Sequence, residues 1–213
     1  MKAFIFDLDG VIVDTAKYHY LAWKRIGEKV GFSLTHEQNE SLKGVSRKES
    51  LERILDWANV RLSEEEKEVL LIKKNEDYLH QIEGMGQEEI LPGVLDLLHF
   101  AQKNNIPVSL GSASKNATHI LKKLAIDHLF DAIVDGNNVT ASKPNPEVFL
   151  KGAELLKQKP NNCIVFEDAA AGIQAAKAAG MISIGMGGTE EVKTADHCFT
   201  SMTAITKEFI TTL

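Results

Sequence analysis

The chain has 213 residues, of which 44% are hydrophobic and 25% are charged. This composition is typical of a soluble globular protein and excludes disordered, collagen-like and disulfide-dense classes. The formal net charge of −6, with no run of five Lys or Arg residues, disfavours a nucleic-acid partner. A chain of this length holds one large domain, or one domain that carries an insertion.

The N-terminal segment is too briefly apolar for a signal peptide or a membrane helix, because its hydrophobic run ends at Asp7. We therefore expect a cytoplasmic protein with no membrane partner. Cys163 and Cys198 both lie in apolar segments typical of strands. Two buried, reduced thiols fit this placement better than a disulfide or a zinc site.

Short apolar runs typical of buried parallel strands recur along the chain, and helical patterns alternate with them. The predicted strands are residues 2–6, 108–110, 132–134, 164–166 and 182–184. The predicted helices that follow them are residues 94–103, 116–124, 147–156 and 169–178. This alternation predicts an α/β fold with a doubly wound, mainly parallel sheet.

One long segment interrupts the alternation, because it contains helix signals alone. Within it, Ser46 and Ser63 each precede a glutamate by three residues, which is the spacing of a capping box. Pro92-Gly93 marks the return to the sheet. The predicted domains are an α/β core of residues 1–14 and 87–213 and an inserted helical cap of residues 15–86.

Carboxylates follow the first and fourth predicted strands, at the sheet edge where open α/β folds bind ligands. Asp7 and Asp9 are two residues apart, which places both side chains on one face of an extended segment. Such a pair binds a divalent cation or divides acid and base roles; alternatively, it only caps a turn. Glu167 and Asp168 add the oxygen ligands that Mg²⁺ prefers, unless Asp168 is merely a helix N-cap.

The other two strand ends carry groups that suit a phosphate. Ser112 can donate to phosphate oxygens, and the helix that begins near Lys115 offers free N–H groups. Lys143, in a loop stiffened by two prolines, can neutralise the charge that Asp7 and a phosphoryl group share. Taken alone, such a lysine would be a solvated surface residue.

Four motifs therefore occur in chain order, each at a strand end: D7-L-D9-G10, Ser112, Lys143 and E167-D168. Together they resemble those of the haloacid dehalogenase-like (HAD) phosphotransferase superfamily, which implies a Rossmann-like HAD core with an inserted cap. The resemblance assigns Asp7 as the nucleophile that becomes phosphorylated and Asp9 as the general acid and base. The Mg²⁺ ligands that it implies are Asp7, the backbone carbonyl of Asp9, Glu167 and Asp168.

The cap sequence bears on whether such an enzyme hydrolyses or transfers, because both reactions pass through an aspartyl phosphate. Arg47 lies in the first turn of a predicted helix, where its guanidinium can grip a second phosphate. Ser114, Lys115 and Asn116 can complete that site from the core. A mutase that passes through a bisphosphate needs two phosphate sites, whereas a monophosphatase needs one. Alternatively, Arg47 is a surface arginine paired with Glu49 or Ser50.

Within the superfamily the resemblance narrows to the β-phosphoglucomutases, over nearly the whole chain. The segments that carry it are D7LDGVIVDT15, His19, Trp23, L42KGVSR47, Lys74-Asn75, L91PG93, S112ASKN116, S142KP144 and E167DAAAGI173. It implies interconversion of β-D-glucose 1-phosphate and D-glucose 6-phosphate, with β-glucose 1,6-bisphosphate as intermediate and activator. Ala169 and Ala170 depart from the family, in which a polar residue is common here.

The resemblance also implies a set of residues around the substrate, with His19 helping to place Asp9. The implied phosphate and sugar contacts are His19, Trp23, Gly44, Val45, Ser46, Arg47, Lys74, Ser112, Ala113, Ser114, Lys115, Asn116 and Lys143. From the residues alone, His19 and Trp23 are equally compatible with packing in the cap. The expected partner is a small phosphorylated sugar, bound by a monomer. A sugar-phosphate phosphatase and a non-catalytic sugar-phosphate-binding module stay open as alternatives.

Overall fold

The computed structural model describes residues 2–213 and contains one sheet, whose six strands are all parallel and follow the order β3-β2-β1-β4-β5-β6. The strands are β1 Ala3–Phe6, β2 Val108–Gly111, β3 Ala132–Val134, β4 Cys163–Glu167, β5 Ile182–Met186 and β6 His197–Phe199. The helices around them are α5 Val94–Lys103, α6 Ala117–Lys123, α7 Glu147–Leu155, α8 Ala170–Ala178 and α9 Lys207–Thr212. The predicted doubly wound α/β fold is confirmed.

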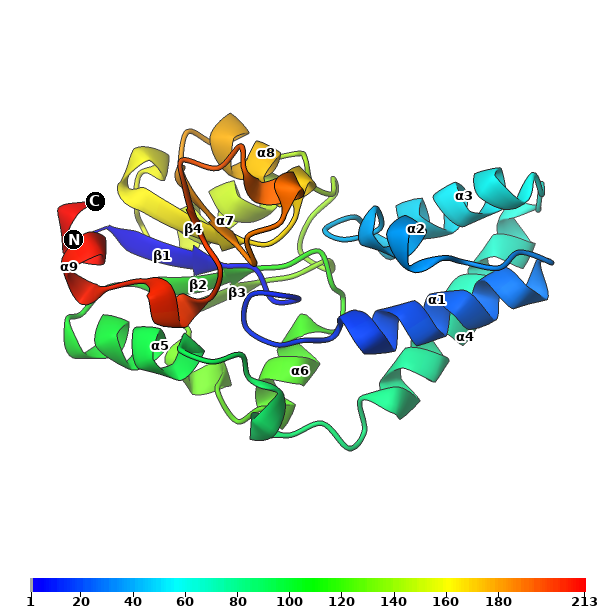
Figure 1. Cartoon of the computed structure of the whole chain (residues 1–213), viewed down its shortest axis with the longest axis horizontal. Helices are drawn as coiled ribbons and strands as arrows, with labels where there is room; N and C mark the ends of the chain where they lie inside the picture. Colours follow the sequence, from blue (N-terminus) through cyan, green and yellow to red (C-terminus); the bar gives the residue numbers. More distant parts are fainter. Residues whose placement is uncertain (1) are drawn as a thin grey trace.

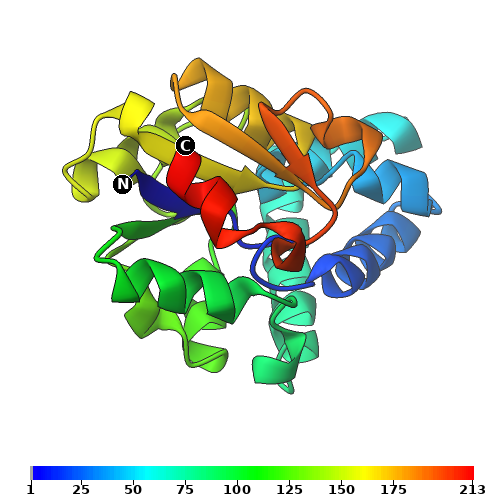
Figure 2. The same ribbon diagram turned by 60° about the vertical axis from the view of Figure 1, so that its left-hand side comes forward.

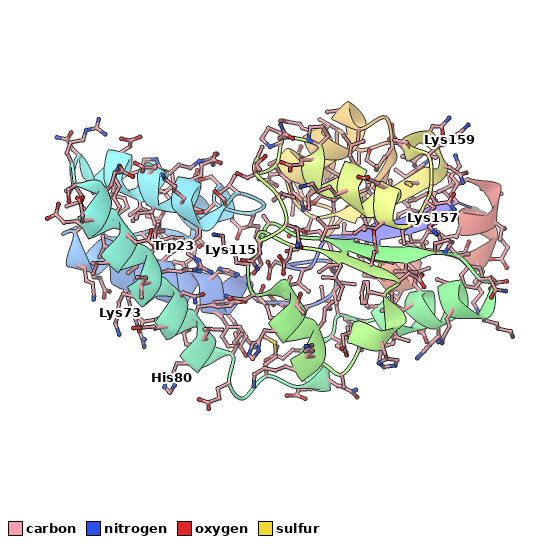
Figure 3. The ribbon with its side chains drawn as sticks, turned by 180° about the vertical axis from the view of Figure 1, so that it is seen from behind. Trp23, Lys73, His80, Lys115, Lys157 and Lys159 are labelled. Atoms are coloured by element: carbon pink, nitrogen blue, oxygen red, sulfur yellow. The ribbon has the colours of Figure 1, made fainter. Side chains whose placement is uncertain are left out.

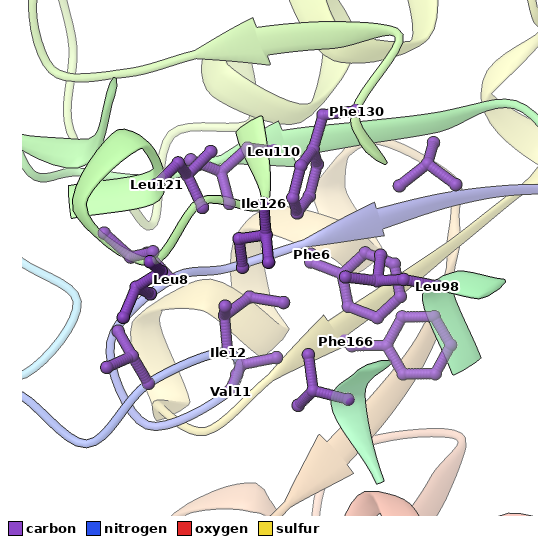
Figure 4. Close-up of a cluster of buried hydrophobic side chains, with 14 of the residues drawn as sticks. Phe6, Leu8, Val11, Ile12, Leu98, Leu110, Leu121, Ile126, Phe130 and Phe166 are labelled. Atoms are coloured by element: carbon purple, nitrogen blue, oxygen red, sulfur yellow. The ribbon is translucent and has the colours of Figure 1, made fainter. Parts of the chain in front are cut away.

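Alternating side chains of β1 supply both hydrophobic layers of the core. Phe4 and Phe6 pack with α5 and α6 on one face, and Figure 4 shows Phe6 among this cluster. Ala3 and Ile5 face the opposite way and pack with α7 and α8. Figure 1 shows these helix pairs on opposite faces of the sheet. Because β1 is buried on both sides, the residue that follows it is held rigidly.

The chain between β1 and α5 folds into helices beside the carboxyl ends of the strands (Figures 1 and 2). These helices are α1 Ala16–Lys29, α2 His36–Glu40, α3 Arg47–Ala58 and α4 Glu64–Gln81. They enclose their own hydrophobic cluster, to which Trp23, Ile26 and Leu51 belong. The separate cluster supports the cap and core division at residues 15–86, which remains our proposal.

The two chain segments that join these parts run side by side. Val13 and Ile90 form an antiparallel bridge, and the Leu91 N–H donates to the Ile12 carbonyl at 2.9 Å. Beyond the bridge, Glu89 in the 3₁₀ turn Gln87–Glu89 accepts from Lys17 at 2.8 Å. The two chain connections between the inserted helices and the core therefore lie at a single place.

Several local predictions need correction. The strand β6 and the helix α9 were not predicted, because each is short and only partly apolar. Cys163 is buried as expected, but Cys198 is exposed, since β6 lies at the sheet edge and turns this side chain outward. The capping box at Ser63 is complete, whereas Ser46 accepts from the Glu49 N–H without the reciprocal bond. Within residues 2–213, no helix is long and apolar enough to cross a membrane.

Candidate active site

A cavity of about 470 Å³ lies between the carboxyl ends of the strands and the inserted helices. Figure 3 shows Trp23 and Lys115, which line it from the two sides. The central position of β1 between β2 and β4 brings the strand ends with chemistry next to one another. The predicted site residues that line the cavity are Asp7, Asp9, His19, Trp23, Gly44, Val45, Ser46, Arg47, Lys74, Ser112, Ala113, Ser114, Lys115, Asn116, Lys143 and Asp168.

The floor of the cavity is a buried cluster of charges around Asp7. The Nζ of Lys143 donates to Asp7 Oδ1 at 2.6 Å and to Glu167 Oε2 at 2.8 Å. Burial lowers the pKa of Lys143, but the charges of Asp7 and Glu167 outweigh burial and raise it overall. Lys143 is therefore a fixed cation, not the solvated surface lysine that its sequence position also allowed.

Three carboxylates gather beside that lysine, and they fit a divalent cation. Asp7, Glu167 and Asp168 offer oxygens within 4.8 Å of one another. Burial, and then the charge of Asp7, raises the pKa of Glu167 to about 7, and burial with the charge of Glu167 raises that of Asp168 well above its usual range. Hard oxygen donors with uncompensated negative charge are the donor set that Mg²⁺ prefers.

The turn that follows Asp9 is closely packed against this acidic cluster. Gly10 has φ +81°, and a Cβ there would lie 2.0 Å from Asp168 Oδ2. Asp168 does not cap the following helix, because the N-cap of α8 is Ala169 and receives no side-chain bond. Its carboxylate is thereby left available to a cation, which removes the capping alternative.

We expect Asp168→Asn to stabilise the protein in a chelator and to weaken its response to Mg²⁺. The amide removes repulsion from two buried carboxylates, but it also removes a ligand. Mg²⁺ at about one hundred times its Kd stabilises the wild type by about 2.7 kcal/mol, and the variant should gain less at the same concentration. Urea unfolding with EDTA and with Mg²⁺ measures both effects. Asp131→Asn, at the opposite end of the sheet, is the control. If Mg²⁺ stabilises both variants equally, Asp168 is excluded as a ligand.

Asp9 is held by the first residues of the inserted segment. The Thr15 hydroxyl donates to Asp9 Oδ1, and for this reason it does not cap α1. His19 Nε2 lies 3.8 Å from the same oxygen. Burial, and then the charge of Asp7, raises the pKa of Asp9 to about 6. A carboxyl with this pKa can both give and accept a proton near neutral pH, which suits a general acid and base.

Lys74 is buried in the cap and has no carboxylate partner among residues 2–213. Its Nζ lies 2.9 Å from His19 Nδ1 and sits over the rings of Trp23 and Tyr78, at 4.8 and 4.7 Å from their centroids. Burial, and then the charge of Arg47, lowers the pKa of Lys74 to about 7. The aromatic faces and the neutral imidazole partly stabilise the ammonium, and an anionic ligand would stabilise it further.

Lys74→Met should stabilise the protein, and by more at neutral than at alkaline pH. Unfolded Lys74 binds a proton up to about pH 10.5, whereas folded Lys74 releases it above about pH 7. Wild-type stability from this group therefore rises with pH between these two values, because the unfolded state binds more protons there. Urea unfolding of both proteins at about pH 7 and about pH 10 measures the difference. A difference in unfolding free energy between the two proteins that is the same at both pH values would contradict a lowered pKa of Lys74.

The loop after β2 is held in place by its own serine side chains and by a contact with the cap. Ser112 is buried, and its Oγ accepts from the Ser114 N–H at 3.1 Å, while Ser114 Oγ accepts from the Asn116 N–H at 3.2 Å. The side-chain amide of Asn116 donates through Nδ2 to Asn75 Oδ1 of α4 at 2.9 Å, which ties this loop to the cap. The Ser112–Asn116 segment therefore lines the cavity where cap and core meet.

On the cap side, Arg47 begins α3 and lines the cavity. One of its two alternative partners, Glu49, is occupied, because it accepts from Arg53 at 2.6 Å. Within residues 2–213 the Arg47 side chain makes no ion pair or hydrogen bond to the protein. Gly44, with φ +72°, would place a Cβ 3.1 Å from Ala169. The small Ala169 thus allows the Gly44 backbone to approach the start of α8 closely.

Two contacts of this site were missed from the sequence. Lys43 Nζ lies 2.6 Å from Glu40 and 3.8 Å from Asp168 Oδ2, so it joins the cap to the acidic cluster. The Tyr78 ring lies against the His19 ring in a tilted arrangement, at 4.3 Å between ring centroids. The one available signal was that Lys43 precedes Gly44 in the motif. Glu167, which was predicted, lies buried beneath the cavity floor rather than on its surface.

Comparison with known proteins identifies this arrangement. The sequence model of one protein family, the haloacid dehalogenase-like hydrolases, matches residues 1–180 of this chain. The chain belongs to this family. It is 44% identical over 212 residues to the β-phosphoglucomutase of Bacillus subtilis, covering 99% of this chain and 94% of that protein. The resemblance drawn from the motifs is thereby confirmed.

Two further members of the haloacid dehalogenase-like hydrolases frame the question of activity. The crystal structure of a β-phosphoglucomutase from Clostridium difficile superimposes with a TM-score of 0.96 at 46% identity, covering 100% of this chain and 96% of that one. A phosphorylated carbohydrates phosphatase of Thermotoga maritima is 31% identical over 194 residues, covering 85% of this chain and 82% of that protein. One of these relatives is named as a mutase and the other as a phosphatase. Family membership therefore leaves the activity open, and the residues of the site have to decide it.

Proposed function

We propose that this protein is a β-phosphoglucomutase, which interconverts β-D-glucose 1-phosphate and D-glucose 6-phosphate through β-glucose 1,6-bisphosphate. The high identity to enzymes of that name over the whole chain supports the proposal. The cavity volume of about 470 Å³ suits a phosphorylated sugar. The proposed catalytic residues are Asp7 and Asp9, as the sequence predicts.

The observation that carries the proposal is Arg47, which lines from the cap the same cavity that Asp7 and Lys143 line from the core, and which has no side-chain partner within residues 2–213. A guanidinium that is partly desolvated and has no protein partner suits a bidentate phosphate. The Asp7 end already holds a cation for one phosphoryl group. A second cationic group in the same cavity supplies the second site that a bisphosphate needs.

In the proposed reaction an oxygen of Asp7 attacks the phosphorus of one phosphate, and the bond from phosphorus to the sugar oxygen breaks. Asp9 gives its proton to that leaving sugar oxygen, and in the reverse transfer it takes a proton from the hydroxyl that attacks. Lys143 holds Asp7 in place from 2.6 Å. Thr15 and His19 orient the Asp9 carboxyl, and Arg47 with Lys74 binds the other phosphate. Positioning and charge stabilisation supply most of the acceleration.

We propose that one Mg²⁺ is held by Asp7, Glu167, Asp168 and the backbone carbonyl of Asp9. When bound, it would neutralise charge on the phosphoryl group during transfer. Lys43 and Lys143, which already lie beside these carboxylates, add positive charge to the same place.

The alternative activity is that of a sugar-phosphate phosphatase, because the Thermotoga maritima relative is named as a phosphatase of phosphorylated carbohydrates. One assay separates it from the mutase and from a non-catalytic binder. The protein is incubated with β-glucose 1-phosphate, Mg²⁺ and a trace of bisphosphate, and glucose 6-phosphate is measured against orthophosphate. We expect glucose 6-phosphate with little orthophosphate. Orthophosphate as the main product would establish the phosphatase, and neither product would leave a binding module.

A further inference from the structure

A carboxylate outside the cavity closes the loop from which Lys143 projects. This loop runs from the end of β3 to the start of α7, and Thr140, Ala141 and Ser142 line the cavity. Glu147 lies in the first turn of α7, beyond the other end of the loop. It does not line the cavity, and the proposed reaction assigns it no role.

Three donors of the loop converge on one oxygen of Glu147. Glu147 Oε2 accepts from the Thr140 N–H at 3.0 Å, the Thr140 hydroxyl at 2.9 Å and the Ala141 N–H at 2.8 Å. Its second oxygen lies 2.8 Å from Lys151 Nζ, one turn further along α7. These partners, Lys151 first and then the Ala141 amide, lower the pKa of Glu147 to about 2. The carboxylate is therefore ionised at any pH at which the enzyme is assayed.

These bonds fix the backbone on both sides of Lys143. The segment from Thr140 to Glu147 becomes a closed ring, and within it the Asn145 N–H donates to the Ser142 carbonyl at 3.0 Å. The side chain of Lys143 then passes over the Phe149 ring of α7, with its Nζ 4.7 Å from the centroid. The reach of Lys143 to Asp7 is thus set by α7, to which Glu147 ties the loop.

We propose that Glu147 is a positioning residue for phosphoryl transfer: it holds Thr140 and Ala141 and so fixes the backbone from which Lys143 reaches Asp7. The inference rests on the proposed function for the role of Lys143, but it does not depend on the sugar. A displacement of about 1 Å in such a group costs about 10²-fold in rate. Charge-assisted bonds to an ionised acceptor are about twice as strong as neutral ones, which explains a carboxylate at this place.

The test follows phosphorylation of Asp7 by acetyl phosphate in the full chain with Mg²⁺. An Asp7 oxygen attacks phosphorus, the bond from phosphorus to the acetyl oxygen breaks, and acetate leaves. We expect Glu147→Ala to lower the maximal rate about 10- to 100-fold, with a small change in the half-saturating concentration and in the unfolding midpoint. Glu147→Gln keeps an acceptor oxygen and should recover much of the rate. Glu154→Ala removes an exposed carboxylate of the same helix and leaves the three loop bonds intact, so it should react as the wild type does.

A Glu147→Ala rate within about twofold of the wild type would overturn the inference, and so would an equal loss in Glu154→Ala. If Glu147→Ala fails to fold, Glu147→Gln decides. Its weaker bonds should still slow phosphorylation at least about threefold, and an unchanged rate overturns the inference. A wild type that is phosphorylated but forms no glucose 6-phosphate refutes the proposed mutase alone. A wild type that is never phosphorylated refutes both.

Discussion

Asp7→Asn is expected to abolish the phosphoenzyme and to lower turnover by at least about 10⁴-fold, as the loss of a nucleophile does. The amide has nearly the shape of the carboxylate, but it lacks the charged oxygen that attacks phosphorus. It also weakens the contact with Lys143 at 2.6 Å. Acid-quenched phosphoenzyme and the yield of glucose 6-phosphate measure the two losses.

The control for Asp7→Asn is Asp131→Asn, which changes the same group at the opposite end of the sheet. Asp131 accepts from the Val108 N–H at 2.8 Å, so this variant loses some stability without touching the cavity. We expect it to form the phosphoenzyme at the wild-type rate. Turnover that survives in Asp7→Asn would remove Asp7 as the nucleophile and with it the covalent mechanism.

Arg47→Ala should reduce mutase turnover about 10²-fold or more and change the hydrolysis of a small phosphate ester little. In the proposed reaction the Arg47 guanidinium makes charge-assisted bonds to the second phosphate, and such bonds contribute about 1.5–3 kcal/mol each. Each difference of about 1.36 kcal/mol corresponds to tenfold in rate. A small ester occupies only the Asp7 end and never reaches Arg47. Parallel assays with glucose 1-phosphate and with a small aryl phosphate compare the two activities.

Arg53→Ala is the matched control for Arg47→Ala. Arg53 lies in the same helix and pairs with Glu49 and with the Ser41 carbonyl, at 2.6 and 2.7 Å. It therefore contributes to the stability of α3 without lining the cavity. If the two activities fall equally in Arg47→Ala, or if Arg53→Ala has the same effect, Arg47 is structural and the phosphatase becomes the better reading.

The sheet was readable from the sequence because its central strands are buried on both faces and carry almost unbroken apolar runs. The segments Ala3–Phe6 and Cys163–Glu167 are of this kind. The edge strand His197–Phe199 was missed because a strand with one free edge needs no such run. Local periodicity also missed α9, whose six residues are too few to give a clear helical pattern.

The site residues were more predictable the closer they lie to the strand ends. Asp7 and Ser112 follow directly after strands and Glu167 ends one, so the topology alone brings them together. The cap residues depend on how the inserted helices lie against the sheet, which no local pattern encodes. Their assignment came from the family resemblance, and the contact of Lys43 with Asp168 across that boundary was not foreseen.

The bridge between Val13 and Ile90 means that the ends of the inserted segment are bonded neighbours. A segment that leaves and re-enters at one point can change length or sequence without disturbing the strands that carry it. In the proposed mutase, the inserted segment, which binds the acceptor, can therefore diverge separately from the core that breaks the phosphate bond, except at its contacts through Lys43 and Asn75. Exchange of this segment with that of the Thermotoga maritima phosphatase, joined at these two residues, should transfer acceptor choice while the nucleophile stays in place.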